Sequence, residues 1–167
     1  MGVDNLGKIE KSITIKVTPE KVWEMLNFER LPEWGEGFGE GLGERVEYTS
    51  EVNTSEDKYR INSTAQGIPT KPEDNYCRFE IIESLEKKKI KYYAWEKPKY
   101  LGKLSMFVTY YIESLGSETK FTYELESGEY GNLGIFGKFL EKLVLRRMTE
   151  KQIEKSLINL KRILEKN

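Results

Sequence analysis

Residues 13–26 read ITIKVTPEKVWEML, an alternating strand that runs directly into a short helix. Around this stretch, residues 8–17 place polar side chains on one face and apolar ones on the other (Ile9, Ile13, Ile15, Val17), with Lys11 the exception on the apolar face. This period-2 alternation predicts a strand with one buried face. Thr18 is a good helix N-cap and Pro19 fits the first helical position, so we expect a helix that turns Val22 and Leu26 inward.

The far end of the chain, residues 134–166, predicts one long amphipathic helix, about 45 Å long at 1.5 Å per residue. Between the two ends we expect a second short helix at Pro32, a loop over residues 66–74 and further alternating segments. These segments lie near residues 46–52, 59–65, 77–81, 90–94, 104–112 and 121–125. Strands joined by short turns predict an antiparallel meander.

The expected fold class is therefore α+β. A curved antiparallel sheet of seven strands would wrap around the long C-terminal helix, with two short helices after the first strand, in a single domain over residues 1–167. Such an arrangement predicts a cavity between sheet and helix that holds something apolar.

The composition excludes several kinds of chemistry. A net charge of −1 with 33% charged residues gives no overall attraction for nucleic acid or anionic lipid. The chain contains no histidine, which removes histidine-based metal sites and Ser-His or Cys-His nucleophilic pairs. Neither a metal nor another cofactor is expected, and any catalysis would rest on Glu, Asp, Tyr, Lys or Cys77. Cys77 is predicted to be buried, where a thiol is inert.

The sequence also gives expectations about location. The N-terminus has no signal-peptide pattern, and no stretch approaches the roughly 18 apolar residues that a membrane span needs, so a cytoplasmic protein without a transmembrane segment is expected. A single cysteine agrees with a reducing compartment. Lys outnumbers Arg and Glu outnumbers Asp, a balance typical of thermophilic proteins.

Two segments carry a resemblance to a known family. The run Ile15-x-Val17-x-Pro19-Glu20-Lys21-Val22-Trp23-Glu24-x-Leu26, closing on Leu31-Pro32-Glu33-Trp34, resembles the start of the polyketide cyclase/dehydrase-like branch of the START/Bet v 1-like superfamily. The ending Leu157-x-x-Leu160-Lys161-x-x-Leu164-Glu165 resembles the closing helix of that superfamily. The resemblance implies a helix-grip fold and a ligand such as a lipid, sterol, polyketide, plant hormone or quinone. Since the superfamily shares no catalytic set, the resemblance assigns no catalytic residue.

Aromatic side chains dominate the predicted inner face of the sheet. The inward set is Tyr48, Tyr59, Phe79, Tyr92, Met106, Tyr110, Phe121 and Tyr123, and Trp34 is placed at the mouth of the cavity. A buried tyrosine needs a partner for its hydroxyl. Two interpretations fit: the hydroxyls face a ligand-filled space, or each one reaches the rim or a backbone carbonyl.

The C-terminal helix adds candidates from its apolar stripe. The stripe runs through Phe139, Leu143, Arg146 and Glu150 to the leucines near the end of the helix. An isolated buried charge is costly, so Arg146 and Glu150 are expected to pair or to meet a polar partner. Either they face the cavity and Arg146 binds a ligand oxygen, or they form an i,i+4 pair at the edge or in solvent.

A second apolar strip, formed by Leu140, Val144 and Met148, lies about 100° from the first. It either packs under the glycine-rich segment of residues 35–43 or is a partner surface, including that of a homodimer.

Three functions follow from these patterns. The first is a carrier or sensor for a small hydrophobic ligand such as a lipid, polyketide or isoprenoid. The second is a cyclase, dehydratase or hydrolase that uses Tyr or Glu as acid-base groups and Arg146 as an oxygen clamp. The third is a protein-interaction module that uses the strip of Leu140, Val144 and Met148.

Overall fold

The computed structural model describes residues 7–36, 45–68, 76–96, 104–128 and 135–166; the side chains of residue 104 and of residues 135–145 lie outside the description. The elements are β1 (Lys8–Ile15), α1 (Pro19–Glu24), the 3-10 turn η1 (Phe28–Arg30), α2 (Leu31–Trp34), β2 (Arg45–Tyr48), the 3-10 turn η3 (Asp57–Tyr59), β3 (Thr64–Ile68), β4 (Arg78–Leu85), β5 (Lys89–Glu96), β6 (Leu104–Ser114), β7 (Thr119–Ser127) and α3 (Ile135–Glu165).

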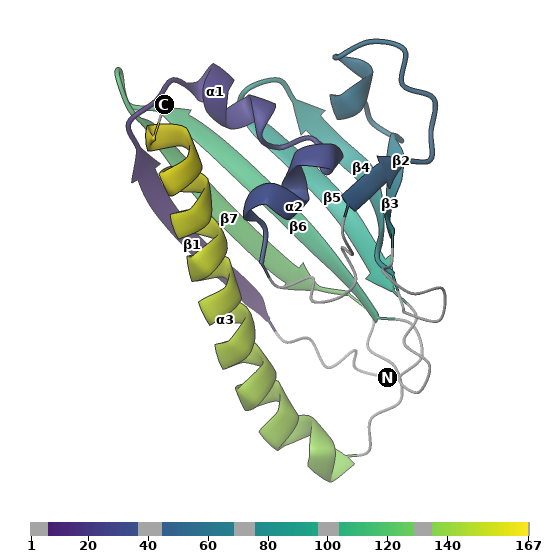
Figure 1. The fold of residues 1–167 in the computed structure, drawn as a ribbon. Helices are drawn as coiled ribbons and strands as arrows, with labels where there is room; N and C mark the ends of the chain where they lie inside the picture. The colour runs from purple at the N-terminus through teal and green to yellow at the C-terminus, as the bar shows by residue number, and fades with distance from the viewer. Residues whose placement is uncertain (1–6, 37–44, 69–75, 97–103, 129–134, 167) are drawn as a thin grey trace.

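The described strands form one antiparallel sheet of seven, in the order β1-β7-β6-β5-β4-β3-β2. Consecutive strands from β2 to β7 are neighbours, as expected for a meander, while β1 lies at the far edge beside β7. Figure 1 shows the twisted sheet with α1, α2 and α3 on the same side of it. The predicted helix-grip architecture, with two short helices after the first strand and a long C-terminal helix, is confirmed.

The first strand and helix form as the sequence predicts. Strand β1 ends at Ile15, and α1 begins at Pro19, which has its φ already set for a helix and no N–H to leave unpaired. Helix α1 buries Val22 and Trp23 against the sheet. Lys87 adopts a left-handed backbone conformation in the tight turn between β4 and β5, with a φ of 56°.

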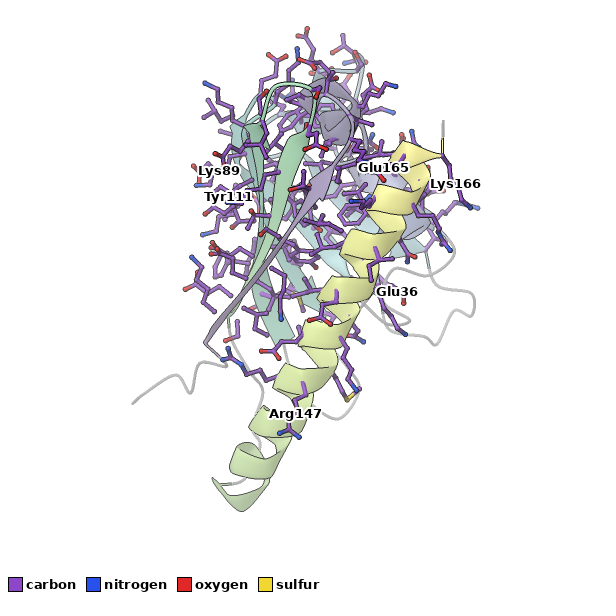
Figure 2. The ribbon with its side chains drawn as sticks, turned by 90° about the vertical axis from the view of Figure 1, so that its left-hand side faces the viewer. Glu36, Lys89, Tyr111, Arg147, Glu165 and Lys166 are labelled. Carbon is purple, nitrogen blue, oxygen red and sulfur yellow. The ribbon has the colours of Figure 1, made fainter. Side chains whose placement is uncertain are left out.

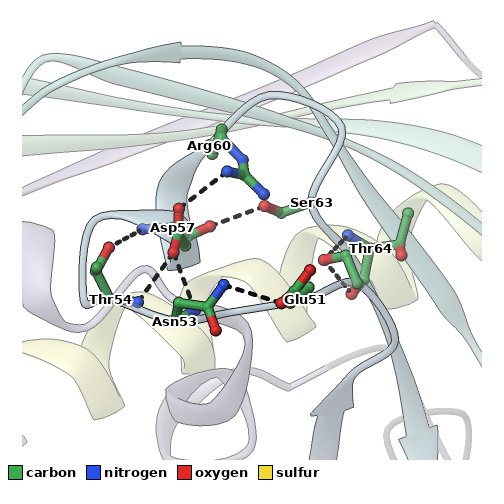
Figure 3. A network of polar contacts seen from close by, with 8 residues as sticks. Glu51, Asn53, Thr54, Asp57, Arg60, Ser63 and Thr64 are labelled. Atoms are coloured by element: carbon green, nitrogen blue, oxygen red, sulfur yellow. Dashed lines mark hydrogen bonds and ion pairs between the residues drawn. The ribbon is translucent and has the colours of Figure 1, made fainter.

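The predicted strand over residues 59–65 is wrong. Tyr59 lies in η3, Ile61 is exposed, and β3 begins at Thr64 and continues through residues 66–68, which were expected to be loop. The cause is Asp57, which accepts hydrogen bonds from the backbone N–H groups of Asn53 and Thr54, each at 2.9 Å, and pairs with Arg60 at 3.1 Å (Figure 3). These contacts stabilise a folded loop in place of an extended strand.

Helix α3 packs its apolar stripe onto the inner face of the sheet. The C-terminal part of α3 buries Ile153, Leu157, Leu160 and Leu164. Full burial of one such side chain stabilises the folded state by about 1.5–3 kcal/mol. The stripe of leucines that the sequence predicted is therefore the packing face of the described half of α3.

Polar contacts then align α3 along the free edge of β1. The Lys161 ammonium donates to the carbonyl of Thr14 at 2.8 Å, and the Glu165 carboxylate accepts from the backbone N–H of Lys16, also at 2.8 Å. Lys11, the lysine on the apolar face of β1, pairs with Glu154 at 3.0 Å. Because exposed ion pairs contribute about 0–1 kcal/mol each, burial supplies most of the stability and these contacts set the position of the helix.

Replacing Leu160 by alanine tests this packing. Leu160 is 0% exposed, so Leu160→Ala should lower the free energy of unfolding by about 2–5 kcal/mol through lost burial and a cavity. Ile158 lies on the same helix but is 60% exposed, so Ile158→Ala should change it by less than about 0.5 kcal/mol. Urea denaturation of both variants measures the difference, and equal effects would contradict the observed orientation of α3.

Candidate functional site

Three side chains fasten the short helices to the sheet and to each other. The Tyr92 hydroxyl donates to the carbonyl of Leu26, and the Trp34 indole N–H donates to the carbonyl of Met25 at 2.9 Å. The Tyr48 hydroxyl donates to the carbonyl of Lys58 at 2.9 Å and accepts from the Phe28 N–H at 3.2 Å. For Tyr48 and Tyr92 these are the backbone contacts of the second interpretation, so their hydroxyls hold the fold together.

Aromatic rings fill the part of the inner face beneath these helices. Phe28 contacts Tyr48, Phe79 and Tyr92 with ring centroids 5.0–5.5 Å apart. Trp34, which is 1% exposed, contacts Tyr110 at 5.4 Å and Phe121 at 6.1 Å. Trp34 is thus part of the aromatic core in this structure, and this half of the inner face is packed with large side chains.

The other half of the inner face carries short side chains. Ala94, near the end of β5, pairs across the sheet with Phe79 and with Met106, and Met106 pairs with Ser127 at the end of β7. Other short residues are buried nearby on β3 and just before β4, namely Ala65, Gly67 and Cys77. All of these lie toward the strand ends opposite α1. Met106 is partly buried against the core.

Tyr110 and Tyr123 form a polar pair between the two halves. Their rings lie edge to face with centroids 4.8 Å apart, and both side chains are almost completely buried. Burial raises the pKa of both phenols well above the ordinary value. Both hydroxyls are therefore protonated at neutral pH and can donate a hydrogen bond to an oxygen acceptor.

Cys77 lies just before β4 and is 1% exposed. Burial, and after it the charge of Glu96, raise the pKa of its thiol. The thiolate is thus strongly disfavoured, and Cys77 behaves as a small apolar residue rather than a nucleophile.

Arg146 and Glu150 lie at the edge of the fold, beside the segment that leads into β1. Arg146 Nε pairs with Glu150 Oε1 at 3.1 Å, and the Arg146 side chain is 44% exposed. A guanidinium nitrogen of Arg146 comes within 3.4 Å of where a Cβ would stand at Gly7. Of the two alternatives from the sequence, this is the i,i+4 pair at the edge.

Tyr59 lies away from the inner face. It stacks on Trp23 at 4.8 Å and lines an open surface groove of about 530 Å³ together with Glu24 and Ile61. Phe139 and Leu143 lie outside the described side chains, as do Leu140 and Val144 of the second strip, whereas Met148 is 52% exposed.

Sequence reasoning missed Ser156. Its hydroxyl is fully buried, accepts from the backbone N–H of Glu36 at 2.7 Å and lies 2.9 Å from the carbonyl of Gln152. It thereby joins the end of α2 to the middle of α3. The signal was a small polar residue beside the apolar stripe of the helix.

The described residues hold no group of three or more Cys, Asp or Glu side chains placed to bind a metal ion. Among the described helices, none is long and apolar enough to cross a membrane.

The pH dependence of stability tests the buried tyrosines. Tyr92, Tyr110 and Tyr123 have pKa values raised by burial, so above pH ~10 they ionise in the unfolded chain but not in the folded one. The unfolded state then binds fewer protons, so stability falls with rising pH, by about 1.4 kcal/mol per pH unit for each tyrosine well above pH ~10.

Urea titrations between about pH 10.5 and 11.5 measure this slope. Tyr110→Phe should reduce it by about 1.4 kcal/mol per pH unit, since one ionising group is removed. If absorbance at ~295 nm showed all 10 tyrosines ionised in the folded protein near pH ~10, the burial argument would fail.

The chain is similar to proteins of one known family over almost its whole length. The family described as polyketide cyclase/dehydrase and lipid transport matches residues 7–165. No match to a curated protein was found.

Among solved structures, the Zhui aromatase/cyclase from Streptomyces sp. R1128 has a TM-score of 0.65 at 15% identity, covering 95% of this chain and 93% of that one. A Mesorhizobium loti protein has a TM-score of 0.65 at 14% sequence identity, and the match covers 96% of this chain and 98% of that one. A START superfamily protein from Mycobacterium smegmatis has a TM-score of 0.58 at 15% identity, with the same coverage of the two chains. At these identities the structural likeness establishes the fold.

Proposed function

The chain belongs to the polyketide cyclase/dehydrase and lipid transport family, and on this basis we propose that it binds a small apolar ligand between the sheet and α3. The ligand class is a lipid, polyketide or isoprenoid, and the protein acts as its carrier or sensor. The observation that carries this proposal is the contrast along the inner face, where large rings fill one half and short buried side chains occupy the other.

The ligand would lie over the half with short side chains. Ala94, Cys77 and Ser127 project little from the sheet, so an apolar body there gains contacts that the sheet residues alone do not supply. Phe79 and Met106 border this region across the sheet. Phe139 and Leu143 would complete it from the helix, by their place on the apolar stripe in the sequence.

The tyrosine pair would bind a ligand oxygen. Tyr110 and Tyr123 are protonated and supply a hydrogen-bond donor in an apolar setting. There, a polar group of the protein or of the ligand that lacks a hydrogen-bond partner costs free energy. We therefore expect ligands with a carbonyl or hydroxyl group rather than pure hydrocarbons. Arg146 is not needed for this role, since it pairs with Glu150 at the edge.

The Zhui aromatase/cyclase makes an enzyme the second candidate. A carrier returns its ligand unchanged, whereas a cyclase or dehydratase changes the structure or mass of what it binds. Raised pKa values keep the tyrosines protonated, which suits them to donating hydrogen bonds, whereas proton transfer near neutral pH is best served by a group whose pKa is about 7. This observation favours the carrier.

A pair of matched probes tests the tyrosine site. Naphthalene and 2-naphthol have the same ring system and differ by one hydroxyl group. Tyr123→Phe should weaken binding of 2-naphthol about 5–10-fold, the value of one hydrogen bond of ~1 kcal/mol, and leave naphthalene binding unchanged. Tyr111→Phe, on the outer face of the sheet, is the control. Equal loss for both probes, or no binding of either, would argue against the proposed site.

Native mass spectrometry with an apolar cell extract distinguishes the two functions. A discrete bound mass recovered unchanged after incubation supports the carrier. A new product mass supports the enzyme. Ala94→Leu should reduce the fraction of protein with bound ligand, because the larger side chain fills the half of the inner face that carries short side chains. The melting temperature of this variant shows whether the fold is retained.

A further inference from the structure

The outer face of α3 carries a strip of basic side chains. The basic strip consists of Arg147, Lys151, Lys155, Arg162 and Lys166, all of them exposed. At 100° per residue these positions lie on the side of the helix opposite the buried Ile153 and Leu160. Figure 2 shows Arg147 and Lys166 toward opposite ends of the described helix, with Lys166 extending away from the sheet. The strip is about 28 Å long at 1.5 Å per residue.

Carboxylates do not neutralise this strip. Within the described part of the chain, no ion pair links any of the five residues to an acid, and Arg162 bonds only the amide oxygen of Asn159. The acids of α3 whose side chains are described pair elsewhere: Glu150 with Arg146, Glu154 with Lys11, and Glu165 with Lys161. Since the whole chain has a net charge of −1, the strip is a local excess of positive charge.

Two exposed apolar side chains accompany the strip. Met148 is 52% exposed and Ile158 is 60% exposed, and both project from the same outer face. A row of basic residues with apolar side chains between them suits the surface of an anionic bilayer, where charges meet headgroups and apolar groups enter the interface. The strip has no aromatic residues on which nucleic-acid bases could stack.

We propose that the outer face of α3 docks on anionic lipid membranes through the basic strip, with Met148 and Ile158 contacting the interfacial region. The protein would lie with α3 parallel to the bilayer and the sheet facing away from it. This proposal does not rest on the ligand site, because vesicle binding is measured without ligand.

The test uses the full chain with phosphatidylcholine vesicles and with vesicles that also contain phosphatidylserine. Co-sedimentation is expected with the anionic vesicles alone. It should be lost in ~1 M salt, where the Debye length falls to about 3 Å from about 10 Å at ~0.1 M. Binding to neither vesicle would overturn the proposal, whatever other polyanion the protein binds.

Charge variants locate the surface. Lys151→Gln with Lys155→Gln should weaken binding to the anionic vesicles about 25-fold, at about fivefold for each basic residue. The control, Lys21→Gln with Lys88→Gln, removes the same charge from exposed sites outside α3 and should bind as wild type. Equal weakening by both pairs would mean attraction by net charge and would overturn the strip as the docking surface.

The apolar residues decide that lipid is the occupant. Met148→Ser with Ile158→Ser should weaken vesicle binding at least threefold and leave binding to soluble heparin unchanged, since heparin offers no apolar phase. Unchanged vesicle binding would overturn the lipid interface in favour of a general polyanion surface. All these positions lie outside the core, so matched thermal unfolding curves exclude misfolding.

Discussion

Strand β1 lies at the edge of the sheet, and helix α3 supplies partners for backbone groups that this edge leaves unpaired. The carbonyl of Thr14 and the N–H of Lys16 meet side chains from the last turns of α3, and Lys11 meets Glu154 two turns earlier. These contacts join the two ends of the chain and protect an exposed edge from pairing with another molecule. They also hold α3 over the inner face, so the depth and contents of the proposed ligand site depend on them.

The inner face shows how one sheet can serve both stability and binding. Tyr92, beneath the short helices, donates its hydroxyl to the carbonyl of Leu26, and Trp34 of α2 donates its indole N–H to the carbonyl of Met25. Both polar groups are thereby removed from contact with a ligand and fasten the short helices. Tyr110 and Tyr123 contact each other instead, ring edge to ring face. A hydroxyl that bonds no backbone group of the described residues can donate to a ligand without stranding such a group. This difference in partners separates the supporting tyrosines from the proposed binding ones.

The sequence predicted the architecture well because alternation and helical periodicity report burial directly, as in β1 and the leucine stripe of α3. It failed at Tyr59, where Asp57 organises a loop through local hydrogen bonds that periodicity does not register. It did not decide whether Arg146 and Glu150 face the cavity or lie at the edge, because the apolar stripe does not show where the sheet stops covering the helix. Ser156 and the pairing of Lys11 depend on contacts between residues more than 100 positions apart, which a single sequence does not encode as a pattern.

Helix α3 therefore has three surfaces with separate tasks. Among its described side chains, the leucines face the sheet, Glu154, Lys161 and Glu165 face the edge of β1, and the basic strip faces outward. Because the basic strip shares no side chain with the packing face, charge on the outside can be changed at little cost to the fold. A membrane docked on the strip would lie against the same helix that covers the proposed site. The 100° step between successive residues is what allows one helix to separate these roles.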